Sequence, residues 1–260
     1  MSNSAPSSYR MVLAYDGTAY HGWQAQPRLR TIQGELNRAL AQLTSEHPVI
    51  KAAGRTDAGA HAHGQVISFD LQSEWTPQSL AGACNALLPA DIGVRTVDLV
   101  SADFHPRFAA WRRTYRYLIR DGAVADPVGR QYQWRVPRSL ELAPMRAAAR
   151  LLLGRHDFAA FGSSPVSGGS TTRSVDRAEL QRQGKAIHLE IRADAFLKRM
   201  MRNFAGALVA VGSGRCTLAD LQRALSAPGG VRVPWEMAPA HGLHQWRVEY
   251  RMPDDEAVRS

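Results

Sequence analysis

The stretch AGRTDAGAHAHG at residues 53–64 places one cation and one carboxylate, Arg55 and Asp57, among small residues and histidines. Small neighbours let another backbone approach closely, and the three glycines permit an unusual chain path. A carboxylate on a loop that follows a short strand is a candidate nucleophile or acid–base group. A structural role, in which Asp57 caps a turn and pairs with Arg55, explains the same residues.

The two histidines of this stretch offer a second kind of chemistry. Asp57, His61 and His63 supply oxygen and nitrogen ligands for a metal-dependent hydrolase, but the sequence offers no obvious further ligand. We therefore favour packing or RNA contact for His61 and His63 and expect no metal.

A third segment, FLKRMMRNFAGALVAVG, predicts a helix over residues 196–211 whose apolar stripe includes Phe196 and Phe204. The helix would carry Lys198, Arg199 and Arg202 in its first turns, where cations oppose the helix dipole. An anion or a paired carboxylate would offset that cost. We expect Lys198 to be solvated and Arg202, flanked by apolar residues, to point inward to such a partner.

Aromatic and basic residues alternate on a fourth segment, WRRTYRYLI, which predicts a strand over residues 111–119. Tyr115 and Tyr117 fall on one face of that strand and Arg116 on the other. A basic surface interleaved with aromatic rings suits single-stranded nucleic acid. Core or cross-strand packing of the tyrosines is the alternative.

The elements around these segments repeat one order, βαββαβ, in each half of the chain. In the first half, hydrophobic patterning predicts strands at 10–15, 49–53, 64–71 and 94–99 and helices at 31–43 and 77–88. In the second half it predicts strands at 111–119, 175–182, 186–193 and 243–250 and helices at 139–153, 196–211 and 217–225. We therefore expect an α+β protein with two ferredoxin-like or RRM-like domains and antiparallel sheets.

The predicted domain limits are 9–105 and 106–252, with tails at 1–8 and 253–260. Residues 1–105 contain 7 Lys and Arg against 9 Asp and Glu, so the remaining 25 and 14 give residues 106–260 a net charge of +11. A field of that sign attracts polyanions, and nucleic acid is the leading partner class. A non-catalytic RNA-binding protein or chaperone would share this charge and these aromatic residues.

The composition of the chain indicates where in the cell the protein is located. No apolar run approaches the ~20 residues of a membrane helix, and the N-terminus lacks the apolar core of a signal peptide. We expect a cytoplasmic protein that does not bind membranes. Cys84 and Cys216 are then reduced core residues.

Taken together, the chain from about Tyr9 to Tyr250 resembles the tRNA pseudouridine synthase A family. The resemblance rests on AYDGTAYHGWQAQP, TIQGELNRAL, AGRTDAGAHAHGQV, NALLPADI, FHPRFAAWRRTYRYLI, GRHDFAAF, FLKRMMRNFAGAL and APAHGL, in that order. It implies isomerisation of uridine to pseudouridine at positions 38, 39 and 40 of the tRNA anticodon arm. It also implies a homodimer without cofactor or metal, in which two α+β domains flank a central basic cleft.

The resemblance also implies roles for individual residues. Asp57 matches the family's nucleophile, Arg202 its basic partner, and Tyr115 the tyrosine that stacks on the target base. Arg55 matches the arginine that helps displace that base, and Leu243 is expected to line the pocket. The chain departs from the family's GLYL pattern at Gln245, a polar residue where an aliphatic one would line or support the pocket.

The implied reaction needs no redox or group-carrier cofactor, because only a proton is exchanged with solvent. The nucleophile can attack uracil C6, attack ribose C1′ or assist elimination to a glycal. All three routes remain open at this stage, as does the choice among the three uridines.

Overall fold

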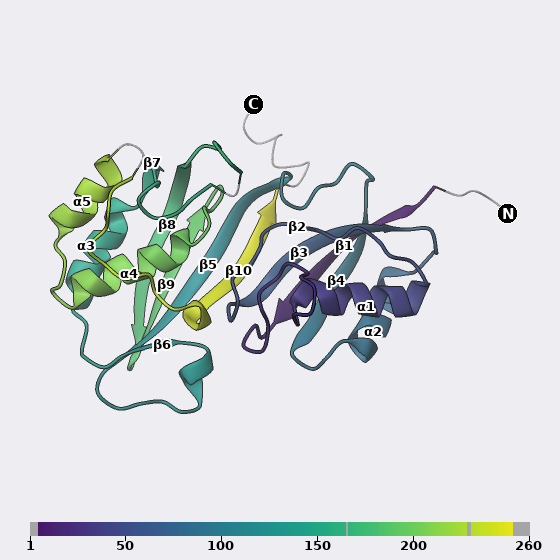
Figure 1. Cartoon of the computed structure of the whole chain (residues 1–260), viewed down its shortest axis with the longest axis horizontal. Coiled ribbons are helices and arrows are strands. Elements are labelled where there is room, and N and C mark those ends of the chain that lie inside the picture. The colour runs from purple at the N-terminus through teal and green to yellow at the C-terminus, as the bar shows by residue number, and fades with distance from the viewer. Residues whose placement is uncertain (1–4, 165, 228–229, 252–260) are drawn as a thin grey trace. The chain divides into compact units, whose positions relative to one another are not determined.

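The computed structural model describes residues 5–164, 166–227 and 230–251. The chain forms two compact units of mixed α and β structure (Figure 1). The first unit runs to Trp111 and resumes at Gln245, and the second is Arg112–His244. Most of the predicted tails, 1–8 and 253–260, lies outside the described residues, although the first strand already begins at Ser7.

The first unit confirms the predicted order of elements. Its first six elements are β1 (Ser7–Tyr15), α1 (Ile32–Thr44), β2 (Lys51–Ala52), β3 (His61–Leu71), α2 (Pro77–Leu87) and β4 (Ile92–Val100). β1 pairs antiparallel with both β3 and β4, so that Met11 faces Ile67 on one side and Val97 on the other. The strand order is β4-β1-β3-β10, in which β10 is Leu243–Tyr250, and β2 lies beside β3.

One buried core joins the helices of this unit to a single face of its sheet. Tyr9, Met11 and Leu13 alternate inward along β1, as a strand with a period of two requires. They pack in the same cluster as apolar residues of both helices, including Ile32, Leu36 and Leu40 of α1 and Leu80 and Cys84 of α2. The helices are capped at their N-termini by Thr31 and Thr76, whose hydroxyl oxygens accept from the amides of Gly34 and Ser79.

The closing strand of the chain, β10 (Leu243–Tyr250), was predicted to complete the second domain. From Gln245 onward it belongs instead to the first unit, beside β3. The close approach explains Gly64, because a Cβ there would lie 2.8 Å from the carbonyl oxygen of Trp246. Alternation of apolar and polar residues predicts the strand itself but not its neighbour.

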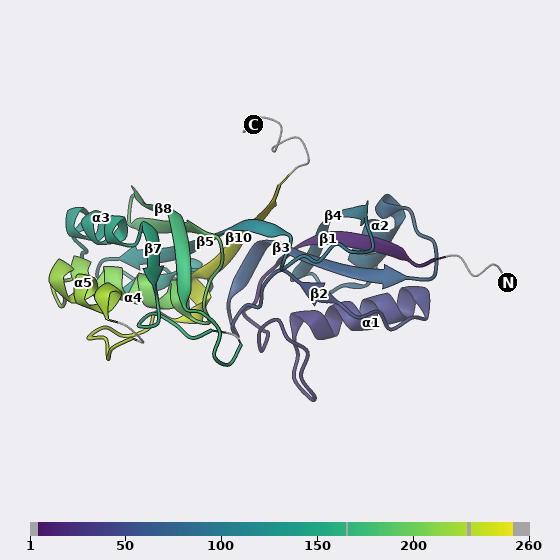
Figure 2. The ribbon, with the colours of Figure 1, turned by 90° about the horizontal axis from the view of Figure 1, so that it is seen from above.

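The second unit also follows the predicted order, with short additions. Its elements are β5 (Ala110–Asp121), η1 (Gly129–Gln131), β6 (Trp134–Val136), α3 (Leu142–Leu151), β7 (Gly154–Asp157), β8 (Thr172–Gln183), β9 (Ala186–Ala193), α4 (Met200–Gly212), α5 (Leu218–Ser226) and η2 (Ala240–Gly242). The strand order is β5-β9-β8-β7, with β6 beside β5. In Figure 2, helices α3, α4 and α5 gather at the end of this unit that carries β7 and β8.

The prediction of purely antiparallel sheets is wrong at β6. This strand pairs parallel to the end of β5, with Ile119 opposite Trp134 and Asp121 opposite Val136. Parallel neighbours need a crossover connection, which residues 122–133 provide, and a strand of three residues carries too little periodicity to be recognised in the sequence. The other strand pairs described within this unit, β5–β9, β7–β8 and β8–β9, are antiparallel.

Candidate active site

The loop between β2 and β3 in the first unit presents Asp57 on a tight turn. The carbonyl oxygen of Asp57 accepts from the amide of Ala60 at 3.1 Å, and Gly59 within that turn has a φ of 79°. This φ lies in the left-handed region that glycine adopts without strain. Asp57 itself is half-buried, whereas Arg55 on the same loop is exposed. A backbone hydrogen bond within the turn therefore fixes the chain at Asp57.

A second segment, residues 15–23, is hydrogen-bonded to this loop. The amide of Trp23 donates to the carbonyl oxygen of Thr56 at 3.1 Å, and the hydroxyls of Tyr15 and Thr56 are 2.9 Å apart. Gly59 donates its amide to the carbonyl oxygen of Tyr20 at 3.2 Å. The loop is thus bonded on both flanks of Asp57.

Two glycines allow that close contact. A Cβ on Gly17 would collide with the carbonyl oxygen of Ala60, and one on Gly22 would lie 2.8 Å from the carbonyl oxygen of Thr56. Gly22 also has a φ of 85°. Sequence reasoning assigned no role to this segment, although its DGTAYHGW pattern, with glycines beside a strand end, was the available signal.

A buried pair of glutamines supports the start of the loop. The side-chain amide of Gln65 donates to the carbonyl oxygen of Gly54 at 2.8 Å, and that of Gln245 donates to Oε1 of Gln65 at 3.2 Å. Both side chains are fully buried. Gln245, the residue that departs from the family pattern, therefore acts on the loop through Gln65.

His61 and His63, at the start of β3, pack within the first unit. Nδ1 of His61 lies 3.1 Å from the amide nitrogen of Gly17 and 3.1 Å from Oδ1 of Asp16. Nδ1 cannot both accept a hydrogen bond from the Gly17 amide and donate one to the Asp16 carboxylate. We assign the bond from the Gly17 amide, which makes Nε2 the protonated nitrogen. His63 packs on Trp246 with ring centroids 4.4 Å apart. The residues that the structure describes include no group of three or more ligands suited to a metal.

Tyr115, a candidate residue of the second unit, lies on the face of β5 that also carries Tyr117 and Ile119. All three side chains are buried, while Arg116 and Leu118 between them are half-buried, which confirms the predicted alternation. Tyr115 meets Phe196 edge to face with ring centroids 4.6 Å apart. Leu243 is also buried, at the start of β10.

Arg202 is fixed to the segment that precedes η2. Its Nε donates to the carbonyl oxygen of Ala238 at 2.8 Å, and the amide of Ala238 donates back to the carbonyl oxygen of Arg202 at 3.2 Å. The hydroxyl of Tyr117 donates to the next carbonyl, that of Pro239, at 2.6 Å. Burial raises the pKa of this hydroxyl well above its ordinary value, and the nearby charge of Arg202 opposes that rise only in part.

The beginning of α4 differs from the prediction. The helix begins at Met200, so Lys198 and Arg199 precede it and Arg202 alone of the three lies in its first turn. Arg199 occupies the left-handed region with a φ of 69°, which prevents the helix from extending toward Phe196. Lys198 exchanges backbone hydrogen bonds with Ser163, and its side chain is exposed as expected.

The motif GRHDFAAF, residues 154–161, anchors the start of α4. Phe158 and Phe161 meet Phe204 edge to face, both at 5.2 Å between centroids. The side-chain amide of Asn203 donates to the carbonyl oxygen of Phe161 at 2.7 Å. These contacts fix the helix turn that carries Arg202.

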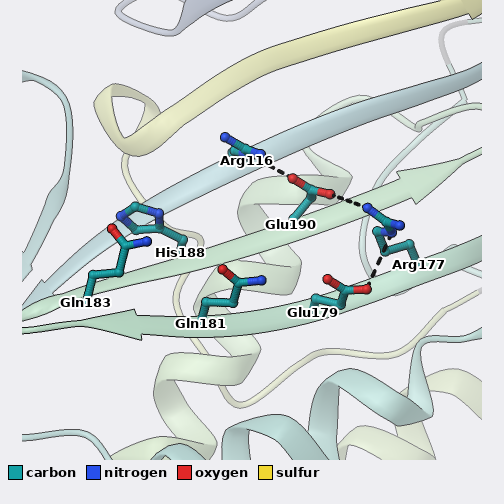
Figure 3. Close-up of a pocket in the computed structure, with 7 residues that line it drawn as sticks. All are labelled: Arg116, Arg177, Glu179, Gln181, Gln183, His188 and Glu190. Carbon is teal, nitrogen blue, oxygen red and sulfur yellow. Dashed lines mark hydrogen bonds and ion pairs between the residues drawn. The ribbon is translucent and has the colours of Figure 1, made fainter.

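A hollow on the opposite face of this sheet is a separate feature. It is lined by side chains of β5, β8 and β9 and contains a chain of ion pairs, drawn in Figure 3. Arg116 lies 2.7 Å from Glu190, which lies 3.0 Å from Arg177, and Arg177 lies 3.4 Å from Glu179. Because Arg116 points away from the face of Tyr115 and Tyr117, this hollow does not include the candidate catalytic residues.

Comparison with known proteins identifies the family. A family model described as tRNA pseudouridine synthase matches residues 11–109 and 148–251. A tRNA pseudouridine synthase A from Citrifermentans bemidjiense is 37% identical over 242 residues, which cover 93% of this chain and 97% of that protein. The enzyme of the same name from Geobacter sulfurreducens is 39% identical over 241 residues, covering 93% and 98%. That of Methylacidiphilum infernorum is 38% identical over 256 residues, covering 98% and 100%.

The chain belongs to the tRNA pseudouridine synthase family. It is accordingly an isomerase, and the resemblance inferred from its motifs is confirmed. No helix among the described residues has the length and apolar character required to cross a membrane.

Proposed function

We propose that this chain isomerises uridine to pseudouridine at positions 38, 39 and 40 of the tRNA anticodon stem-loop, with Asp57 as the nucleophile. The family assignment supports tRNA uridine isomerisation. The observation that carries the assignment of the nucleophile is the turn at half-buried Asp57, whose loop is hydrogen-bonded through its backbone on both flanks of this residue. Such fixed placement is what a reacting group requires.

The reaction breaks the bond between uracil N1 and ribose C1′ and forms a bond between C5 and C1′. The proton on C5 is lost and N1 gains one, so no redox or group-carrier cofactor is needed. Asp57 would act by attack at C6, by attack at C1′ or by assisting elimination to a glycal. The target base is stacked or paired in the tRNA and must be extruded first, at a cost of a few kcal/mol.

Arg202, Tyr115 and Arg55 take supporting roles in this proposal. A closed pocket would favour the protonated carboxyl, and a guanidinium beside it restores the anion and orients it through two hydrogen bonds. The Nε bond to Ala238 supports Arg202 for that role, because it fixes the plane of the guanidinium. Tyr115 would carry the flipped base on its ring, Leu243 would line the pocket, and exposed Arg55 would occupy the vacated space.

The same proposal includes the finer organisation of the enzyme. Two α+β domains would flank a central basic cleft, and the active enzyme would be a cytoplasmic homodimer. The excess of positive charge in residues 106–260 supports the basic cleft.

The substrate assignment is tested by incubating pure protein with unmodified tRNA and mapping pseudouridine with a carbodiimide that marks the modified base. We expect reverse transcription to stop in the anticodon arm at one or more of positions 38, 39 and 40. Pseudouridine formed only elsewhere in the tRNA would contradict the proposed site while leaving the family assignment intact.

A further inference from the structure

The connection between β5 and β6 encloses a hollow that none of the proposed catalytic residues reaches. Its volume is about 340 Å³. Its lining residues are Arg120, Ala125, Asp126, Pro127, Arg130, Gln133 and Arg135. Three guanidinium groups therefore share this hollow with one carboxylate.

Two of the arginines are neighbours across a strand pair. Arg120 of β5 and Arg135 of β6 are direct partners in the parallel register. Like charges placed opposite each other in a sheet are destabilising. Arg130, on the short η1 turn, adds a third positive charge to the same hollow.

Asp126 balances only part of this charge. Its Oδ2 lies 3.4 Å from Nη1 of Arg120 and accepts from the side-chain amide of Gln133 at 2.8 Å, while its Oδ1 accepts from the amide of Gly129 at 3.2 Å. The Gly129 bond is the main reason that the pKa of Asp126 lies below its ordinary value. Within residues 5–164, 166–227 and 230–251, neither Arg130 nor Arg135 forms an ion pair with a carboxylate.

Arg120 also retains an unused donor. Its Nε is buried and has no hydrogen-bond partner in the part of the chain that the structure describes. A buried donor without a partner is costly, and a planar guanidinium is suited to the oxygens of a phosphate group. Arg135 uses one of its donors on the carbonyl oxygen of Ala123 at 2.7 Å, which holds its side chain over the loop.

We infer that the hollow bounded by Arg120, Arg130 and Arg135 is a binding site for phosphodiester groups of the RNA substrate, outside the site of isomerisation. Three guanidinium groups against one carboxylate leave two positive charges, which complement successive backbone phosphates. The hollow in Figure 3 lacks this property, because its arginines are already paired with Glu179 and Glu190. The inference rests on the proposed tRNA substrate.

The first test compares two variants from which the same charge is removed. Arg130→Gln/Arg135→Gln alters the hollow, while Arg150→Gln/Arg223→Gln removes two exposed arginines of α3 and α5. Binding of unmodified tRNA is measured by filter retention between about 50 and 200 mM salt. In this range, each phosphate that the protein no longer neutralises makes the negative slope of log K against log salt shallower by about 0.9.

We expect the hollow variant to bind on the order of tenfold more weakly, with a slope that is shallower by about 1 to 2, and the α3/α5 variant to retain the wild-type slope. Equal slopes for the two variants would overturn the inference. Failure of wild-type protein to bind tRNA would contradict the proposed substrate instead, and the second test would still examine the hollow.

The second test follows the Nε–H resonance of Arg120 in protein labelled with ¹⁵N-arginine, assigned by its absence from Arg120→Lys. Dimethyl phosphate, as the phosphodiester probe, should shift this resonance, and chloride at equal ionic strength should not. No shift with dimethyl phosphate overturns the site. A shift with inorganic phosphate alone, and no change in the tRNA slope, assigns the hollow to free phosphate and overturns the RNA inference.

Discussion

The side chains of Gln65 and Gln245, 180 positions apart in sequence, are joined by a hydrogen bond of 3.2 Å in the core of the first unit. Gln65 connects this pair to the loop of Asp57 through its 2.8 Å bond to the carbonyl oxygen of Gly54. Oε1 of Gln245 is buried and has no partner among the described residues. The two glutamines therefore differ in what their removal would leave unsatisfied.

That difference predicts unequal effects of Gln65→Leu and Gln245→Leu. Gln65→Leu leaves the Gly54 carbonyl without its side-chain partner and should lower the free energy of unfolding by about 2 kcal/mol and reduce kcat. Gln245→Leu removes an unpaired buried oxygen and should change stability by less than about 1 kcal/mol. Urea unfolding measures the stability of each variant, and single-turnover assays measure its activity. Equal losses would show that the Gly54 bond does not govern the loop.

Arg202→Lys should lower kcat by roughly tenfold or more. The Nε bond to Ala238 fixes the guanidinium plane, and an ammonium cannot keep that bond while orienting a carboxylate through a second pair of donors. Binding of tRNA should change little, because the positive charge is retained. Single-turnover kinetics at saturating enzyme separate the rate of the reaction from the affinity for tRNA. A variant with unchanged kcat would remove Arg202 from the reaction.

Tyr115→Phe should retain more activity than Arg202→Lys, since a phenyl ring can still stack on a base and keeps the edge-to-face contact with Phe196. An inactive Tyr115→Phe enzyme would instead assign its hydroxyl the role of proton acceptor from C5. The rates of the two variants are compared in the same assay.

Tyr117→Phe is the matched structural control, because its hydroxyl is bonded to Pro239. It should lower the free energy of unfolding by about 1 kcal/mol, measured by urea unfolding. A stability equal to that of wild type would show that the bond to Pro239 contributes nothing.

The ion pair between buried Asp121 and partly exposed Arg182 predicts a pH-dependent stability. Arg182 contacts both carboxylate oxygens, at 2.8 and 2.9 Å, and the amide of Leu140 donates at 2.9 Å. Burial alone would raise the pKa of Asp121, but these hydrogen bonds and the charge of Arg182 outweigh it and place the pKa below its ordinary value. The stabilisation is therefore present above the unfolded pKa of about 3.9 and is lost as the pH falls through the lower folded pKa.

Asp121→Asn should accordingly cost about 2 kcal/mol between pH 5 and 8, since Arg182 remains partly exposed. The difference from wild type should shrink below about pH 4. Unfolding by urea across this range provides the measurement. A difference that stays constant down to pH 2 would show that the carboxylate charge is not the stabilising element.

The sequence predicted the order of the main elements because each carries a clear period, as in the alternation of β5 around Tyr115 and Tyr117. It did not predict β6 or the neighbour of β10, because strand pairing depends on contacts distant in sequence. The start of α4 was placed too early, since the left-handed backbone of Arg199 has no sequence signature for a non-glycine residue.

The residues of the candidate site likewise divide into those that the sequence predicted and those that only the structure revealed. Asp57, Arg55, Tyr115, Arg202 and Leu243 were chosen from motifs, and their roles in catalysis and binding stay predictions. Gln65 and the segment around Gly17 and Gly22 emerged only from the structure, because their contribution is a hydrogen bond or a missing Cβ, which the residue type alone does not reveal.

The most direct test of the central claim is tritium release from C5-labelled tRNA by Asp57→Asn and Asp57→Ala, with tRNA binding measured in parallel. An amide has nearly the shape of the carboxylate but is not a nucleophile, so both variants should release no tritium while binding tRNA nearly as tightly as wild type. Turnover by either variant would contradict the assignment of Asp57 as the nucleophile.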